Sequence, residues 1–123
     1  MNAVVADQLT QLVLRTSINA AQSIYQQSYD YTSVSPASLS PLVPNVQFGA
    51  LEQAGTRIVG VLAQDRNDVL LVARSASGRW YCVTENAMDG ISYGAGATLS
   101  DVDSNGECQQ PAWPAPGHAA SPF

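Results

Sequence analysis

The chain has 123 residues, of which 46% are hydrophobic and only 12% are charged. All five basic residues are arginine, and with ten acidic residues they give a net charge of -5 at pH 7. The length suits a single domain. The acidic balance argues against nucleic acid and anionic lipid as partners, because both are bound through clustered basic side chains.

Neither a membrane span nor a signal peptide is recognisable. A transmembrane helix needs about 18 or more consecutive apolar residues, and no such run occurs. No basic stretch precedes an apolar core, as it would in a signal peptide. Met1 stands directly before residues that resemble the middle of a helix. We therefore expect the chain to be a truncated fragment whose upstream part has been removed.

A long helix is predicted over residues 3–29, which contain neither glycine nor proline. Apolar residues recur with the helical period along it, at Val5, Leu9, Leu12, Leu14, Ile18, Ala21 and Tyr25. A helix of this length is ~40 Å long, about the width of a domain of this size. We expect it to form the spine of the molecule, with its first turns projecting beyond the core.

Residues 30–55 are predicted as a linker with little regular structure, because prolines and serines are frequent in them. The residues expected to anchor this part of the chain in the core are Tyr29, at the end of the helix, and Tyr31, Leu39 and Leu42 in the linker. A weak strand is predicted at residues 46–51, where Gly49 interrupts the apolar pattern.

An antiparallel β-meander is predicted within residues 56–85. Its strands are residues 56–64, 69–74 and 79–84, which are rich in β-branched, aliphatic and aromatic side chains. The connectors between them are so short that only antiparallel neighbours can be joined. The expected fold class is α+β, with the long N-terminal helix packed on a three- to four-stranded antiparallel meander.

The C-terminal part is predicted to lack regular structure. Residues 86–113 contain scattered glycines and are expected to form a loop region, which completes a single domain over residues 1–113. Residues 114–123 are expected to be a flexible proline-rich tail. Trp113 has enough apolar area to dock back onto the domain.

Cys82 and Cys108 are the only cysteines. They lack the spacing and the partners of a zinc site, and the only histidine, His118, lies in the predicted tail. They form either a disulfide or two buried thiols, and we favour the disulfide, which would bound the C-terminal loop. Closing this loop would stabilise the fold by ~3–4 kcal/mol and would indicate an oxidising, extracytoplasmic setting.

The segment from Asp101 to Glu107 is similar to the first half of an EF-hand loop. Its candidate calcium ligands are Asp101, Asp103, Asn105 and Glu107. The closing acidic residue of that motif is missing, since Ala112 occupies its position. An ordinary surface turn has the same composition and is the alternative that we favour. No other cofactor is predicted.

No catalytic constellation is apparent, and we predict that the chain is not an enzyme. A nucleophile needs a positioned base, and His118 lies among prolines and small residues. The sequence Gly94-Ala95-Gly96 is too short for a phosphate-binding loop.

Several stretches resemble type IV pilins and pseudopilins, in particular those of high-GC Gram-positive bacteria. They are Ser28-Tyr29-Asp30-Tyr31-Thr32, then Ser38-Leu39 and Leu42-Val43-Pro44, then Val72 to Gly78 with Trp80-Tyr81-Cys82-Val83, and finally Tyr93-Gly94 with Cys108. The resemblance covers most of residues 3–113. It implies a headgroup from which the hydrophobic half of the N-terminal helix has been removed.

This resemblance implies a structural subunit of an extracellular, cell-surface filament with a role in adhesion or secretion. Full-length members carry a leader and a hydrophobic helix half, which anchors the precursor in the cytoplasmic membrane. An assembly ATPase then drives polymerisation through the helix, with copies of the same chain and other pilins as partners. Some pseudopilins hold calcium in a C-terminal loop. Without the missing half, this chain is expected to be a soluble monomer.

The alternative is a secreted binding module that recognises carbohydrate or depends on calcium, with the meander or the C-terminal loop as its binding face.

Overall fold

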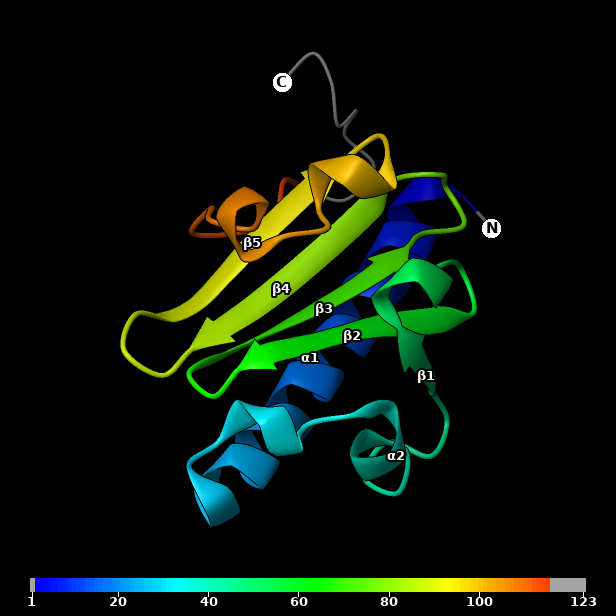
Figure 1. Cartoon of the computed structure of the whole chain (residues 1–123). Helices are drawn as coiled ribbons and strands as arrows, with labels where there is room; N and C mark the ends of the chain where they lie inside the picture. The colour runs from blue at the N-terminus through cyan, green and yellow to red at the C-terminus, as the bar shows by residue number, and fades with distance from the viewer. Residues whose placement is uncertain (1, 116–123) are drawn as a thin grey trace.

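The computed structural model describes residues 2–115, in which one long helix lies across one face of a five-stranded sheet (Figure 1). Helix α1 spans Ala3–Ser28, which confirms the predicted spine. The side chain of Asn2 caps its start by accepting a hydrogen bond from the Val5 N–H. It ends at Tyr29, which adopts a left-handed conformation with φ 54°.

The five strands lie in the sheet in the order of the sequence. They are β1 (Gln47–Ala50), β2 (Ile58–Asp65), β3 (Asp68–Arg74), β4 (Trp80–Asn86) and β5 (Gly90–Gly96). Strands β2, β3, β4 and β5 are paired antiparallel. The predicted three-stranded meander is therefore present as β2, β3 and β4.

Strand β5 corrects the prediction that residues 86–113 lack regular structure. Its alternate residues Ile91, Tyr93 and Ala95 pack on the side of the sheet that faces α1. On the other side, Gly94 and Gly96 lie directly beneath the C-terminal loop, where a side chain would collide. The glycines that suggested a loop are thus strand residues at which another part of the backbone approaches closely.

Strand β1 confirms the weak strand but shows that the sheet is mixed. It pairs with β2 in parallel, so the sheet is not a pure meander. The connection, which includes the 3-10 turn Leu51–Gln53, crosses over the face of β2 away from α1. A Cβ atom at Gly60 would lie 2.8 Å from Ala54 Cβ, so this crossover depends on the missing side chain.

Apolar side chains are buried on both faces of the sheet. The cluster beneath α1 contains Leu14, Ile18, Ala21, Tyr31, Val34, Leu39, Val59, Val61, Val69, Leu71, Ala73, Tyr81 and Val83. The cluster on the opposite face contains Leu70, Val72, Cys82, Val102 and Cys108 and is covered by the C-terminal loop. The central strand β3 is buried on both faces, which accounts for its continuous apolar run.

The linker is more regular than predicted. It contains the 3-10 turn Tyr31–Ser33 and the short helix α2 (Pro36–Leu39), which Ser35 caps. The predicted anchors Tyr31 and Leu39 are fully buried, whereas Tyr29 and Leu42 are exposed, so only two of the four anchors were right.

Within the described range, no helix is both long and apolar enough to cross a membrane. Of the predicted tail, only Pro114 and Ala115 are described, and His118 lies outside the described residues.

Candidate functional site

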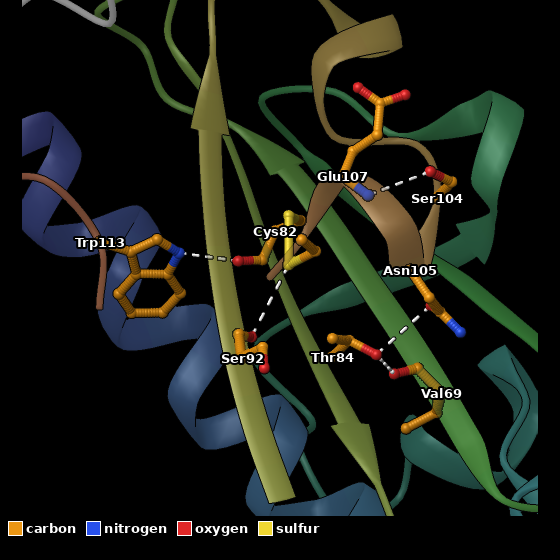
Figure 2. The surroundings of a disulfide bond; sticks show 9 residues. Val69, Cys82, Thr84, Ser92, Ser104, Asn105, Glu107 and Trp113 are labelled. Carbon is orange, nitrogen blue, oxygen red and sulfur yellow. Dashed lines mark hydrogen bonds between the residues drawn. A yellow bond between two sulfur atoms is a disulfide. The ribbon is translucent and has the colours of Figure 1, made fainter. Parts of the chain in front are cut away.

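The predicted disulfide is present and ties the C-terminal loop to β4. Cys82 and Cys108 are bonded, their Cα atoms are 6.1 Å apart, and both side chains are fully buried (Figure 2). The alternative of two buried thiols is therefore excluded. The bond joins the middle of the sheet to the segment that covers its outer face.

Residues 108–113, which we call the C-terminal strap, wrap around the edge of β5. The backbones of Gln110 and Tyr93 exchange two hydrogen bonds of 2.7 and 2.9 Å. The strap then reaches the face of the sheet that α1 covers, where Trp113 Nε1 donates to the Cys82 carbonyl oxygen at 2.7 Å. Figure 2 shows Trp113 pointing toward β4 beside α1.

Trp113 also packs against aromatic and cationic side chains. Its ring is T-shaped against Tyr93, with centroids 4.7 Å apart, and the Arg15 guanidinium lies 5.4 Å from its centroid. The prediction that Trp113 docks back onto the domain is confirmed.

The candidate calcium ligands are engaged in the turns of the loop itself. Asp101 Oδ2 accepts hydrogen bonds from the N–H groups of Ala97 and Thr98, both at 3.0 Å. Hydrogen bonding from the Thr98 backbone is the main reason that the pKa of Asp101 is lowered. Asn105 Oδ1 lies 3.3 Å from the Thr84 hydroxyl (Figure 2).

The other two candidate calcium ligands, Asp103 and Glu107, do not form a common binding site with Asp101 and Asn105. The Glu107 side chain is exposed, and its N–H donates to Ser104 Oγ at 3.3 Å; Asp103 is half-buried. In the part of the chain that the structure describes, no three His, Cys, Asp or Glu side chains form a metal-binding group. Calcium binding by this loop stays a prediction.

Helix α1 carries a second apolar face. Val5, Leu9 and Leu12 are 41%, 46% and 58% exposed. At 100° per residue they lie on the side of the helix opposite the buried Leu14 and Ile18. They therefore do not contribute to the core beneath the helix.

A groove of about 520 Å³ runs beside this face, between α1 and the start of β2. Its apolar lining includes Leu9, Val13, Val46, Ile58, Val59 and Ala73. Arg57 and Arg74 also line it, and none of the described residues around it is acidic. In a protein with a net charge of -5, this is a locally basic and apolar surface.

A buried ionic cluster fixes the N-terminal part of α1 to the β3–β4 turn. Asp7 is fully buried, accepts a hydrogen bond of 2.6 Å from Ser77 Oγ, and pairs with Arg79 at 3.4 Å. Burial raises the pKa of the nearby Tyr81 to about 12. We did not predict this cluster, although Asp7 lies seven residues before Leu14 and thus on the buried face.

A second carboxylate lies near the other end of α1. Glu85 on β4 is half-buried near Gln22 and Tyr31, and its Oε2 atom is buried with no hydrogen-bond partner among the described residues. Burial outweighs the opposing effect of these polar neighbours and raises the pKa of Glu85. Because Asp7 lies beside Arg79 and Gln22 beside Glu85, α1 runs in the same direction as β4.

Comparison with known proteins identifies no relative: no family model, no curated protein and no solved structure matches this chain.

Proposed function

We propose that this chain is the globular head of a subunit of an extracellular type IV filament, and that subunits pack together through α1. The single observation that carries the proposal is the second apolar face of α1, formed by Val5, Leu9 and Leu12. A helix that lies on a sheet needs one apolar face to bury. A second face that is left in water favours a partner for that face.

The low charge of the helix supports packing against copies of itself. Arg15 and Asp7 are the only charged residues in α1, and Asp7 is buried beneath the helix. Few charges would therefore lose water if several such helices packed together. Interface cores in protein assemblies are depleted of charged residues in the same way.

The disulfide supports an extracellular location. Cys82 and Cys108 form a buried bond, and bonds of this kind persist in oxidising compartments. The order of a long helix, antiparallel strands and a disulfide-bonded C-terminal loop also agrees with what the resemblance to type IV pilins implies. A partner of the same chain, arranged side by side through the helix, follows from this proposal.

The direct test is to locate the chain on cells that produce it. Antibodies raised against the purified chain would be used to label sheared surface filaments for electron microscopy. We expect gold particles along the filaments and the chain among their subunits by mass spectrometry. Recovery of the chain only as a free secreted protein, with unlabelled filaments, would overturn the proposal.

A variant tests the role of the helix face. Val5→Gln combined with Leu12→Gln should abolish filaments while the circular dichroism and the melting temperature of the purified chain stay unchanged. Leu42→Gln is the matched control, because Leu42 is as exposed as Leu12 but lies in the linker. Filaments of normal number and length in the helix variant would contradict packing through α1.

A further inference from the structure

The β4–β5 turn presents the most exposed large apolar side chain of the described residues. Met88 is 86% exposed and is followed by the exposed Asp89. Asn86 Oδ1 accepts hydrogen bonds from the N–H groups of both residues, at 2.9 and 3.1 Å. Gly90, with φ 87°, then returns the chain into β5. The turn is thus a fixed projection with an apolar tip and an adjacent negative charge.

The groove has the complementary character. Its lining combines apolar side chains from α1, β2 and β3 with the two arginines Arg57 and Arg74. Arg74 contacts Trp80 and the Gly78 carbonyl oxygen. Arg57 is exposed and makes no ion pair within the described residues. An apolar side chain with a neighbouring carboxylate would satisfy both features.

The projection and the groove lie at opposite ends of the sheet. The strand register aligns Asp68, Asn86 and Gly90 at one end and Arg74, Trp80 and Gly96 at the other. The groove includes Arg74 and Ile58, whereas Met88 immediately follows Asn86. In Figure 1 the β4–β5 turn lies at the lower left and the N-terminal turns of α1 lie at the upper right.

We propose that the β4–β5 turn of one subunit docks into this groove of the next subunit, with Met88 in the apolar part and Asp89 beside Arg57. The inference rests on the proposed filament function and assigns a second contact to it. Between subunits that are oriented alike, as in a filament, the contact is head-to-tail and leaves one turn and one groove free. Its repetition generates an open chain of subunits where the rotation between neighbours does not close a ring.

The contact is weak between free molecules. One buried methionine side chain and one exposed ion pair do not offset the translational and rotational freedom that two free chains lose. When another contact already holds two subunits together, docking of the turn into the groove becomes effectively intramolecular. The docked state is then well populated although the contact itself is weak. The purified chain therefore stays monomeric at micromolar concentration and docks only transiently.

Cysteine trapping captures such a transient contact. Chains carrying Ala87→Cys are mixed at high concentration with chains carrying Thr56→Cys, under a mild oxidant that leaves the buried disulfide intact. Ala87 is exposed next to Met88, and Thr56 is exposed in the groove. We expect the mixed dimer to form several-fold faster than the control dimer between Ala87→Cys and Leu42→Cys chains.

Two further substitutions test the chemistry of the contact. Met88→Ser in the Ala87→Cys chain and Arg57→Glu in the Thr56→Cys chain should each reduce trapping to the control rate. Asp89→Lys should restore trapping when its partner carries Arg57→Glu, because the ion pair is re-formed with reversed signs. Restoration would not follow if the variants acted only by disturbing the fold.

Several outcomes would overturn the contact. These are trapping at the control rate, no effect of Met88→Ser, or no effect of the charge reversal. Labelled filaments without preferential trapping would refute the contact and leave the filament proposal standing. Preferential trapping with unlabelled filaments would support the contact and refute the filament proposal.

Discussion

Gly94 on β5 shows how a single residue allows the C-terminal loop to cover the sheet. A Cβ atom at this position would lie 2.6 Å from Cys82 Sγ and 3.2 Å from Cys108 Cα. The disulfide and the backbone beside it are held on both sides and cannot move away without cost. The absence of a side chain is therefore required by packing and not by an unusual backbone conformation.

We predict that Gly94→Ala destabilises the protein by ~2 kcal/mol through overpacking. The free energy of unfolding would be measured by urea denaturation with the disulfide intact. Gly55→Ala is the control, because a Cβ at Gly55 would meet nothing within 4 Å, and its effect should stay within ~0.5 kcal/mol. Equal effects of the two substitutions would show that the loop does not lie closely on β5.

The half-buried carboxyl group of Glu85 leads us to predict that the stability of the folded protein depends on pH. Burial raises its pKa above the ordinary value of 4.5, so the folded state binds this proton more tightly than the unfolded state does. Its stabilising contribution is complete below pH 4.5 and is lost as the pH rises through the raised pKa. At neutral pH the ionised, half-buried carboxylate is less favourable than a neutral group in the same place.

Glu85→Gln should therefore raise the melting temperature at pH 7, and the gain should disappear below pH 4.5. Thermal unfolding of both proteins from pH 3 to pH 8 measures the difference. Glu52→Gln serves as a control, because Glu52 is exposed. A stabilisation by Glu85→Gln that is the same at all pH values would argue against burial of the ionised group as its cause.

At the scale of elements, the C-terminal strap joins the two faces of the sheet. One of its ends is bonded to β4 through the disulfide, and the other packs beside α1 through Trp113. Between them, Gln110 pairs with Tyr93 at the outer edge of β5. The strap thus covers part of an edge that would otherwise be open to another strand.

We predict that Trp113→Phe costs about 1 kcal/mol, because the hydrogen bond to the Cys82 carbonyl oxygen is lost. Trp113→Ala should cost about 2–3 kcal/mol, since the apolar contacts are lost as well. Urea denaturation measures both. Trp80→Phe, at a half-buried site on the other face, should change stability less. If Trp113→Phe had no effect, the indole N–H would not hold the strap.

Other elements differ in how far their sequence predicts them. Helix α1 was predicted well because 26 residues repeat one period without a breaker. The strands of the meander were predicted because segments rich in β-branched residues are separated by short turns. Strand β5 was missed because Gly94 and Gly96 depend on the loop above them, and β1 was expected only weakly because its parallel partner follows a crossover.

At the scale of the whole molecule, the surfaces proposed to contact other subunits are spread along the length of the sheet and of α1. The basic groove lies at one end of the sheet and the Met88 turn at the other, while the second apolar face follows α1. A net charge of -5 keeps separate molecules apart in solution. The locally basic groove beside α1 is an exception to this acidic balance, and under the proposed contact it favours association with the Met88 turn.

The sequence by itself determined the α+β class, the long helix and the central meander, and it favoured a disulfide between Cys82 and Cys108 over two buried thiols. The helix and the strands follow from local periodicity, whereas the choice between the disulfide and two thiols needed the distance between the two cysteines. Only the tertiary structure decided the mixed sheet, the buried Asp7–Arg79 pair, the strap around β5 and the groove beside α1. Each of these brings together residues far apart in the chain, and no local pattern encodes their distance.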